Sequence, residues 1–272
     1  MGWRVEQPNW IPSGVDVTVP SAARMYDYAL GGFHNFAVDR ETADRIERIV
    51  PGSKLNAHAN RAFVRRAVRW LFGQEIRQFL DVGSGIPTMG NVHEIAHSTA
   101  PEARVLYVDI DPVTVAHSKK ILENVANTRV VQADLTRPAE ILYHPEVLDL
   151  LDFSQPVAVL LNAVLHFVPD AADPEGILTL IREAVVRGSY ITVTHGIPIL
   201  EADFPERQDG IRNAYRRTPT ALYFRRPEHI RKLLFEWDIV EPGIVPVAEW
   251  HPELDGPQKP VIGMVAAVGR KP

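Results

Sequence analysis

Three stretches with helical periodicity precede the first candidate strand. Apolar and aromatic positions recur at helical spacing over residues 21–30, and a second helix is predicted over residues 39–50, closed by a Pro-Gly pair. A third helix, over residues 57–72, carries apolar positions on one side and arginines on the rest. Residues 1–20 hold three prolines without a period and two tryptophans, which predicts an extended arm partly docked on the body.

From residue 78 onward, short apolar runs alternate with helical stretches, which is typical of a mostly parallel, doubly wound sheet. These runs are residues 78–82, 104–108, 128–131, 157–161 and 190–194. Two later runs, 236–240 and 261–268, are joined by a proline-rich stretch instead of a helix, which favours an antiparallel pair. We therefore predict an α/β fold: a doubly wound, seven-stranded, mostly parallel sheet with an antiparallel final strand and an N-terminal helical cap.

Composition narrows the classes of partner. The chain has 272 residues, 46% of them hydrophobic, which fits one domain with some additional elements. Its formal charge of -5 gives no basic footprint, so nucleic acid is not an expected partner. The absence of cysteine excludes thiolate metal sites, disulfides and a cysteine nucleophile, and fits a reducing cytoplasm. No run reaches membrane-spanning length and no signal peptide is seen, so we expect a soluble, cytoplasmic protein of open oligomeric state.

The densest chemical signal is the sequence FLDVGSGIPTMG at residues 79–90, an apolar strand that runs into a glycine turn. Such a turn lets a ligand approach the backbone closely. A dinucleotide fingerprint needs a third glycine where Thr88 stands, so a nicotinamide-dependent oxidoreductase (NAD as cofactor) is the weaker alternative. Asp81 before the loop suits a ligand with an amino group, such as the zwitterionic end of methionine.

Carboxylates also follow the next two strands. Asp109 ends the second strand, where it can accept hydrogen bonds from ribose hydroxyls. Asp134 follows the third strand and can accept from an adenine amino group, while Ile110 and Leu135 sandwich the ring. Singly, each acid has a structural alternative, because Asp109 can form a turn and Asp134 can cap a helix. Together they predict one crevice for one adenosine.

These three strand-tip motifs resemble the successive cofactor motifs of class I, Rossmann-like methyltransferases, which bind S-adenosylmethionine. The sequence PSAARMYDYALGG at residues 20–32, with Asn35-Phe36 and Asp39-Arg40, is similar to a narrower group, the S-adenosyl methyltransferase family common in actinobacteria. That family has no agreed substrate. The resemblance implies an arm and helical cap at residues 1–75, within the same domain as an S-adenosylmethionine-binding part at residues 76–272.

The resemblance also assigns cofactor contacts position by position. It implies that the cofactor is lined by Asp81, Gly83, Ser84, Gly85, Asp109 and Asp134, and by Asn162 and Ala163 after the fourth strand. Arg61, on the helix before the first strand, can pair with the cofactor carboxylate. The alternative for Arg61 is a solvated arginine.

Candidate catalytic groups are fewer. Tyr26 lies on a helix that has no place in the minimal sheet and can close over the cofactor, with core packing as its alternative. His166 follows the fourth strand and can take a proton from an acceptor oxygen or nitrogen. His195, after the fifth strand, is the second histidine candidate. A lone histidine is more often a packing or hydrogen-bonding residue.

Two other signals are set aside. The sequence HEIAH at residues 93–97 matches a zinc-protease pattern, but it follows a nucleoside-type turn and leaves little room for a protease cleft, so no metal site is expected. The stretch at residues 216–226, which has a pair of arginines at each end, is too short for a binding arm. We interpret its arginines as lying at solvated helix ends.

The functional hypothesis is methyl transfer from S-adenosylmethionine to a small-molecule acceptor. Catalysis would come mainly from aligning the methyl group and the nucleophile in a closed pocket. The alternative is a non-catalytic sensor or interaction protein that binds S-adenosylmethionine or S-adenosylhomocysteine, because fold and cofactor motifs do not separate the two.

Overall fold

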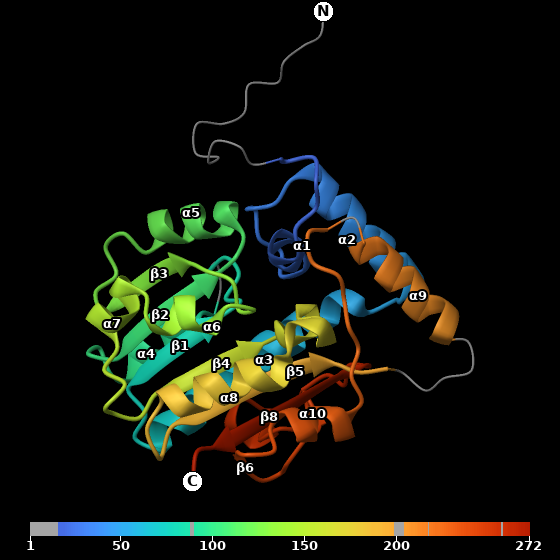
Figure 1. Cartoon of the computed structure of the whole chain (residues 1–272). Coiled ribbons are helices and arrows are strands. Elements are labelled where there is room, and N and C mark those ends of the chain that lie inside the picture. Colours follow the sequence, from blue (N-terminus) through green and yellow to red (C-terminus); the bar gives the residue numbers. More distant parts are fainter. Residues whose placement is uncertain (1–15, 88–89, 199–203, 217, 257) are drawn as a thin grey trace, which may run out of the picture.

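The structure is a computed structural model that describes residues 16–87, 90–198, 204–216, 218–256 and 258–272 (Figure 1). Helices α1 (Ala22–Ala29), α2 (Ala37–Ile49) and α3 (Ser53–Gly73) precede the first strand, as predicted, although α3 begins four residues earlier. The expected docking of the tryptophans in the arm lies outside the described residues. None of the described helices is long and apolar enough to cross a membrane.

The predicted sheet is confirmed, with one strand more than expected. Its order is β3-β2-β1-β4-β5-β8-β6, and β8 runs antiparallel to both β5 and β6. The strands are β1 (Gln78–Val82), β2 (Arg104–Asp109), β3 (Thr128–Gln132), β4 (Ala158–Asn162), β5 (Tyr190–Gly196), β6 (Asp238–Ile239) and β8 (Met264–Arg270). The eighth strand, β7 (Val245–Pro246), pairs with β8 from within the proline-rich stretch. It was missed because two residues show no periodicity.

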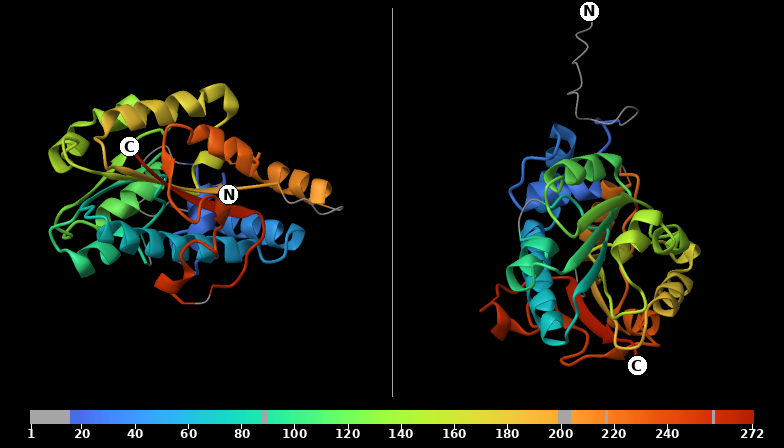
Figure 2. Two further views of the ribbon diagram at one scale, coloured as in Figure 1. Left: turned by 90° about the horizontal axis from the view of Figure 1, so that it is seen from below. Right: turned by 90° about the vertical axis from the view of Figure 1, so that its left-hand side faces the viewer.

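Helices cover both faces of the sheet (Figure 2). One face packs against α6 (Pro138–Leu142), α7 (Pro145–Leu150), α8 (Pro174–Ala184) and α10 (Pro227–Leu233). The other packs against α3, α4 (Val92–Thr99) and α5 (Pro112–Ile121). Successive strand residues point to opposite faces, so Phe79 enters one core and Leu80 the other. Strands buried on both faces explain the continuous apolar runs in the sequence.

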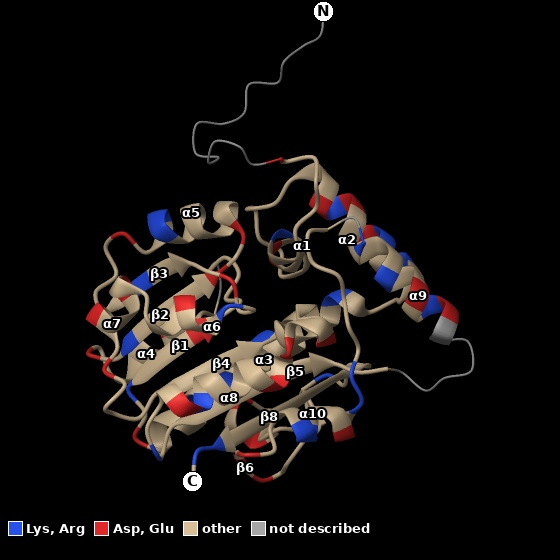
Figure 3. Ribbon diagram, viewed as in Figure 1, with Lys and Arg blue, Asp and Glu red and all other residues tan. Residues whose placement is uncertain are grey.

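A separate helical layer lies beyond the sheet. Helix α9 (Phe204–Tyr215) packs across α2, and a third apolar cluster joins them to α1 (Figure 1). Figure 3 shows acidic and basic residues along α2 and α9, whose charged sides are turned away from this cluster. The helices of the first 75 residues therefore belong to two layers. Helices α1 and α2 pack with α9, whereas α3 packs on the sheet. The boundary at residue 75 stays a prediction.

Arg66 fixes the C-terminal segment to α3. Its buried guanidinium donates from Nε to the carbonyl oxygen of Trp250 at 2.8 Å and from Nη2 to that of Val247 at 2.7 Å. We expect Arg66→Met to lower the free energy of unfolding by about 2–5 kcal/mol, since two buried carbonyls lose their donors. Denaturant unfolding tests this, with the half-exposed Arg69→Met as control; equal losses for both variants would contradict it.

Candidate functional site

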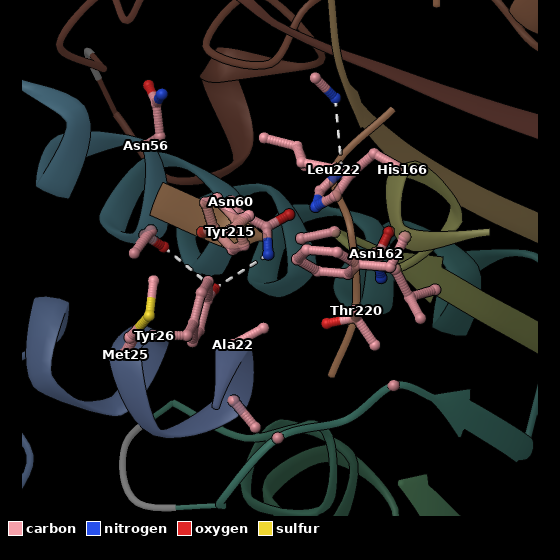
Figure 4. A pocket seen from close by; sticks show the side chains of 18 of the residues that line it. Ala22, Met25, Tyr26, Asn56, Asn60, Asn162, His166, Tyr215, Thr220 and Leu222 are labelled. Carbon is pink, nitrogen blue, oxygen red and sulfur yellow. Dashed lines mark hydrogen bonds between the residues drawn. The ribbon is translucent and has the colours of Figure 1, made fainter. Parts of the chain in front are cut away.

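One cavity of about 750 Å³ lies over the carboxyl ends of the parallel strands and beneath α1, α2 and α9. Of the residues predicted for the site, all but the second histidine candidate, His195, line it: Tyr26, Arg61, Asp81, Gly83, Ser84, Gly85, Asp109, Ile110, Asp134, Leu135, Asn162, Ala163 and His166. We call the part at the tips of β1–β4 the strand-side half. The part lined by α1, α2, the first turn of α3, α9 and residues 219–224 is the cap-side half (Figure 4).

Asp109 holds the glycine loop in place. One carboxylate oxygen accepts the Gly85 amide at 2.8 Å, and the other accepts the Asp111 amide at 2.9 Å. Both Gly83 and Gly85 take positive φ, which explains the glycines. Burial raises the pKa of Asp109 to about 6, although the hydrogen bonds from the two amides act in the opposite direction. The turn contacts of Asp109 are therefore present, and its ribose contact stays a prediction.

Asp81 is the least satisfied charge in the cavity. It is 7% exposed, and its carboxylate makes no hydrogen bond with any described residue. Burial raises its pKa to about 7, while the charge of Arg61 acts in the opposite direction. Arg61 is itself buried and lies over the Tyr26 ring at 5.5 Å, so it is not a solvated arginine. Its Nε has no hydrogen-bond partner among the residues that the structure describes.

The other strand-side residues follow the second, third and fourth strands. Asp134 accepts the Thr136 amide at 2.8 Å, which is a turn contact, while Leu135 is buried and Ile110 is 50% exposed. Asn162 accepts the Thr192 hydroxyl at 3.0 Å, which leaves its buried Nδ2 without a partner among the described residues. The next residue, Ala163, has a φ of 56°.

The two candidate catalytic side chains already have hydrogen bonds. The Tyr26 hydroxyl donates to the Ala57 carbonyl at 3.1 Å and accepts from Asn60 Nδ2 at 2.9 Å, so its ring forms a wall of the cavity. His166 Nδ1 accepts the Gly196 amide at 3.4 Å, and burial lowers the pKa of His166 well below its ordinary value. The ring is therefore neutral at pH 7 with its proton on Nε2, which is a donor.

Comparison with known proteins decides the family. A family model described as S-adenosyl methyltransferase matches residues 8–272. The chain belongs to this family. Its cofactor is S-adenosylmethionine and its reaction is methyl transfer, so the oxidoreductase alternative is set aside.

Solved structures agree with this methyltransferase assignment. A candidate methyltransferase from Thermobifida fusca YX is 37% identical, with a TM-score of 0.86 over 97% of this chain and 99% of that one. A DUF574 family protein from Streptomyces avermitilis is 38% identical, with a TM-score of 0.85 over 94% and 99%. An S-adenosylmethionine-dependent methyltransferase from Anabaena variabilis, 13% identical, shares the fold (TM-score 0.50 over 75% and 80%). No curated protein matches the chain.

The cavity of this methyltransferase fits its cofactor. S-adenosylmethionine carries an ammonium group and a sulfonium group, and the buried, unpaired Asp81 is a suitable partner for the ammonium. Arg61 supplies a cation for the carboxylate at the same end. A Cβ added at Gly85 would meet no atom of the described residues within 4 Å, so these residues leave open space where a ligand can approach the backbone.

Cofactor affinity should depend on pH through Asp81. Only the ionised carboxylate attracts the ammonium, so S-adenosylhomocysteine should bind about 10- to 30-fold more weakly at pH 5.5 than at pH 7.5, given the Asp81 pKa of about 7. Calorimetric titration across this range tests it, and a flat profile would contradict it. The raised pKa also has a stability consequence: the folded chain holds this proton more tightly, so the cofactor-free chain loses stability from about pH 4 to 7.

Arg225 corrects one sequence interpretation. It belongs to the basic stretch expected at solvated helix ends, yet it is buried and donates to the carbonyl oxygens of Leu165 at 2.9 Å and Val168 at 2.6 Å. It also pairs with Asp170 at 2.6 Å. Arg225 therefore fixes the segment that carries His166. His195 Nε2 accepts a hydrogen bond from Nη1 of Arg225 at 3.2 Å. The His195 side chain is fully buried and does not line the cavity.

The zinc-like residues 93–97 have other contacts. His93 lies against the Tyr107 hydroxyl, with 2.8 Å between Nδ1 and the oxygen, and His97 Nε2 lies 3.0 Å from the Ala103 carbonyl oxygen. Glu94 accepts the Asn91 amide at the start of α4. Within the part of the chain that the structure describes, no group of three or more suitable side chains can hold a metal ion.

Proposed function

We propose that this methyltransferase acts on a small-molecule acceptor bound in the cap-side half of the cavity. The observation that carries the proposal is that one cavity is lined both by residues at the strand tips and by residues of α1, α2 and α9. A sensor needs only the strand-side half. Room beside the cofactor region therefore supports turnover over sensing. The absence of nucleic-acid partners, action in the cytoplasm and the oligomeric state stay predictions.

In this proposal, the strand-side residues hold the cofactor. Arg61 and Asp81 bind its amino-acid end, Asp109 its ribose, and Ile110, Asp134 and Leu135 its adenine, with Asn162 and Ala163 beside them. Bound S-adenosylmethionine supplies a methyl group made electrophilic by the sulfonium. Tyr26 closes the cavity against water, and alignment of the two ligands provides most of the rate.

Turnover distinguishes the enzyme from the sensor. The full chain is incubated with methyl-labelled S-adenosylmethionine and a panel of small metabolites, and labelled products are separated by mass spectrometry. We expect label in a small molecule, with release of S-adenosylhomocysteine. Tight cofactor binding without transfer to any of a broad panel would favour the sensor.

A further inference from the structure

Charge is divided unequally between the two halves of the cavity. Every carboxylate among the described lining residues lies at the tips of β1–β3, namely Asp81, Asp109, Asp111 and Asp134. In the cap-side half, the charged lining side chain is Lys54, and its Nζ donates to Asp44 at 2.7 Å. A cationic amine would therefore find no counter-charge there.

The cap-side wall is mostly apolar, although Ser53, Asn56 and Thr220 also line it. Helices α1, α2 and α9 and the segment after them contribute Met25, Ile46, Ile211, Tyr215, Leu222 and Phe224. Figure 4 shows Met25, Tyr215 and Leu222 around the same space. These side chains belong to one cluster that spans the three helices. A ligand in this half gains affinity mainly by burying apolar surface.

Where β4 ends, the free polar atoms are donors. Asn162 Nδ2 is buried without a partner among the described residues, and the oxygen of the same amide already accepts the Thr192 hydroxyl. His166 Nε2 carries the ring proton, because Nδ1 accepts the Gly196 amide. Neither side chain can take a proton from the acceptor. An acceptor group that has already lost its proton to water needs no base from these two side chains, which favours an acidic group.

We propose that the acceptor is an apolar molecule with an acidic oxygen, a carboxylic acid or an acidic phenol, and that this oxygen is methylated. This inference rests on the proposed function. The ionised oxygen accepts hydrogen bonds from Asn162 and His166, and the apolar body lies against the cap-side wall. In the single step, the oxygen bonds the methyl carbon, the carbon–sulfur bond breaks with its electron pair left on sulfur, and the acceptor's proton is already in water.

Probes that share an apolar part and differ in their polar group test which polar group the cavity binds. The full chain, saturated with S-adenosylhomocysteine, is titrated calorimetrically with 1-naphthoate, the acidic phenol 4-nitro-1-naphthol, octanoate, the 1-naphthylmethylammonium ion and octylammonium. We expect at least one compound with an acidic oxygen to bind. Its affinity should be at least about tenfold higher than that of the ammonium ion with the same apolar part. With S-adenosylmethionine, mass spectrometry should show an O-methyl product and one S-adenosylhomocysteine per transfer; naphthoate and nitronaphthol separate the acid from the phenol.

Two variants test the proposed contacts. Asn162→Asp replaces a donor with a carboxylate and should weaken the bound acid at least about tenfold. Leu222→Asn should weaken every probe about tenfold, because apolar contact is lost, whereas Leu148→Asn, on exposed α7, should change none. Binding of S-adenosylhomocysteine is measured separately for each variant.

The outcomes separate the two proposals. If S-adenosylhomocysteine binds but no acidic compound does, or if the ammonium ions bind as tightly, the acceptor inference is wrong and the cofactor assignment stands. Methyl transfer to nitrogen would also overturn the inference while supporting the proposed function. Failure of S-adenosylhomocysteine to bind would overturn both.

Discussion

Asp81→Asn is expected to weaken S-adenosylmethionine binding about 10- to 100-fold, which corresponds to the ~1.5–3 kcal/mol of a hydrogen bond to a charged group. The carboxylate is buried, has no hydrogen bond from a described residue and lies close enough to Arg61 for their charges to interact. Asparagine keeps its shape and removes its charge. Calorimetry measures the change in affinity, and the pH dependence of binding near neutrality should disappear in the variant.

Asp149→Asn is the matched control, because Asp149 is exposed on α7 and does not line the cavity. It should bind the cofactor as the natural chain does. Equal affinity for Asp81→Asn and the control would remove Asp81 from the site. A folding defect is separated from a binding defect by denaturant unfolding of the cofactor-free variants.

Gly85→Ala should weaken cofactor binding while changing the stability of the fold only modestly. Among the described residues, the new Cβ meets no atom within 4 Å, so it projects into open space at the wall of the cavity. The φ of 64° makes alanine unfavourable by ~1–2 kcal/mol. Overpacking against the ligand costs a further ~1–3 kcal/mol of binding, or about 10- to 100-fold in affinity. Calorimetry and denaturant unfolding measure the two effects independently.

Two other glycines provide the controls. Gly31→Ala introduces alanine at a φ of 84° with open space around it and away from the cavity, so it should lose similar stability and no affinity. At Gly83 the added Cβ would overlap the Val164 side chain, so Gly83→Ala should lose more stability than either. If Gly31→Ala and Gly85→Ala bind the cofactor equally well, the open space at Gly85 does not face the ligand.

The sheet and the strand-side half could be predicted because their signals are local. Buried parallel strands appear as apolar runs, and Asp81 and Asp109 follow such runs directly. The carboxyl ends of neighbouring parallel strands share one edge, so residues far apart in the sequence meet there. The strand order then brings Asn162 to the same edge through β4.

The cap-side half was harder to predict because it depends on contacts between distant segments. Helix α9 was not predicted, since Gly210 and several charged residues obscure its apolar spacing of Ile211, Ala214 and Tyr215. That glycine lies against Ile49 of α2, where a Cβ would be 3.1 Å from the isoleucine Cγ2. The spacing of three and four residues was the signal that could have located the helix.

The roles of individual polar side chains depend on burial, which composition does not reveal. Arg225 resembles a surface arginine in the sequence, and only the fold places the carbonyl oxygens of Leu165 and Val168 around it. His166 likewise becomes a donor because the Gly196 amide occupies its Nδ1. Proton transfer to His166 was predicted from residue type alone, whereas the hydrogen bond determines which ring nitrogen is available.

The central claim is that the cavity lined by the thirteen predicted residues binds S-adenosylmethionine. Calorimetric and thermal-shift titrations of the full chain with S-adenosylmethionine, S-adenosylhomocysteine and NAD test it most directly. The account predicts one site per chain for the two sulfur nucleosides, with ~2.7 kcal/mol of stabilisation when the ligand is at 100 times its dissociation constant, and no response to NAD. No binding of either sulfur nucleoside, or selective binding of NAD, would contradict it.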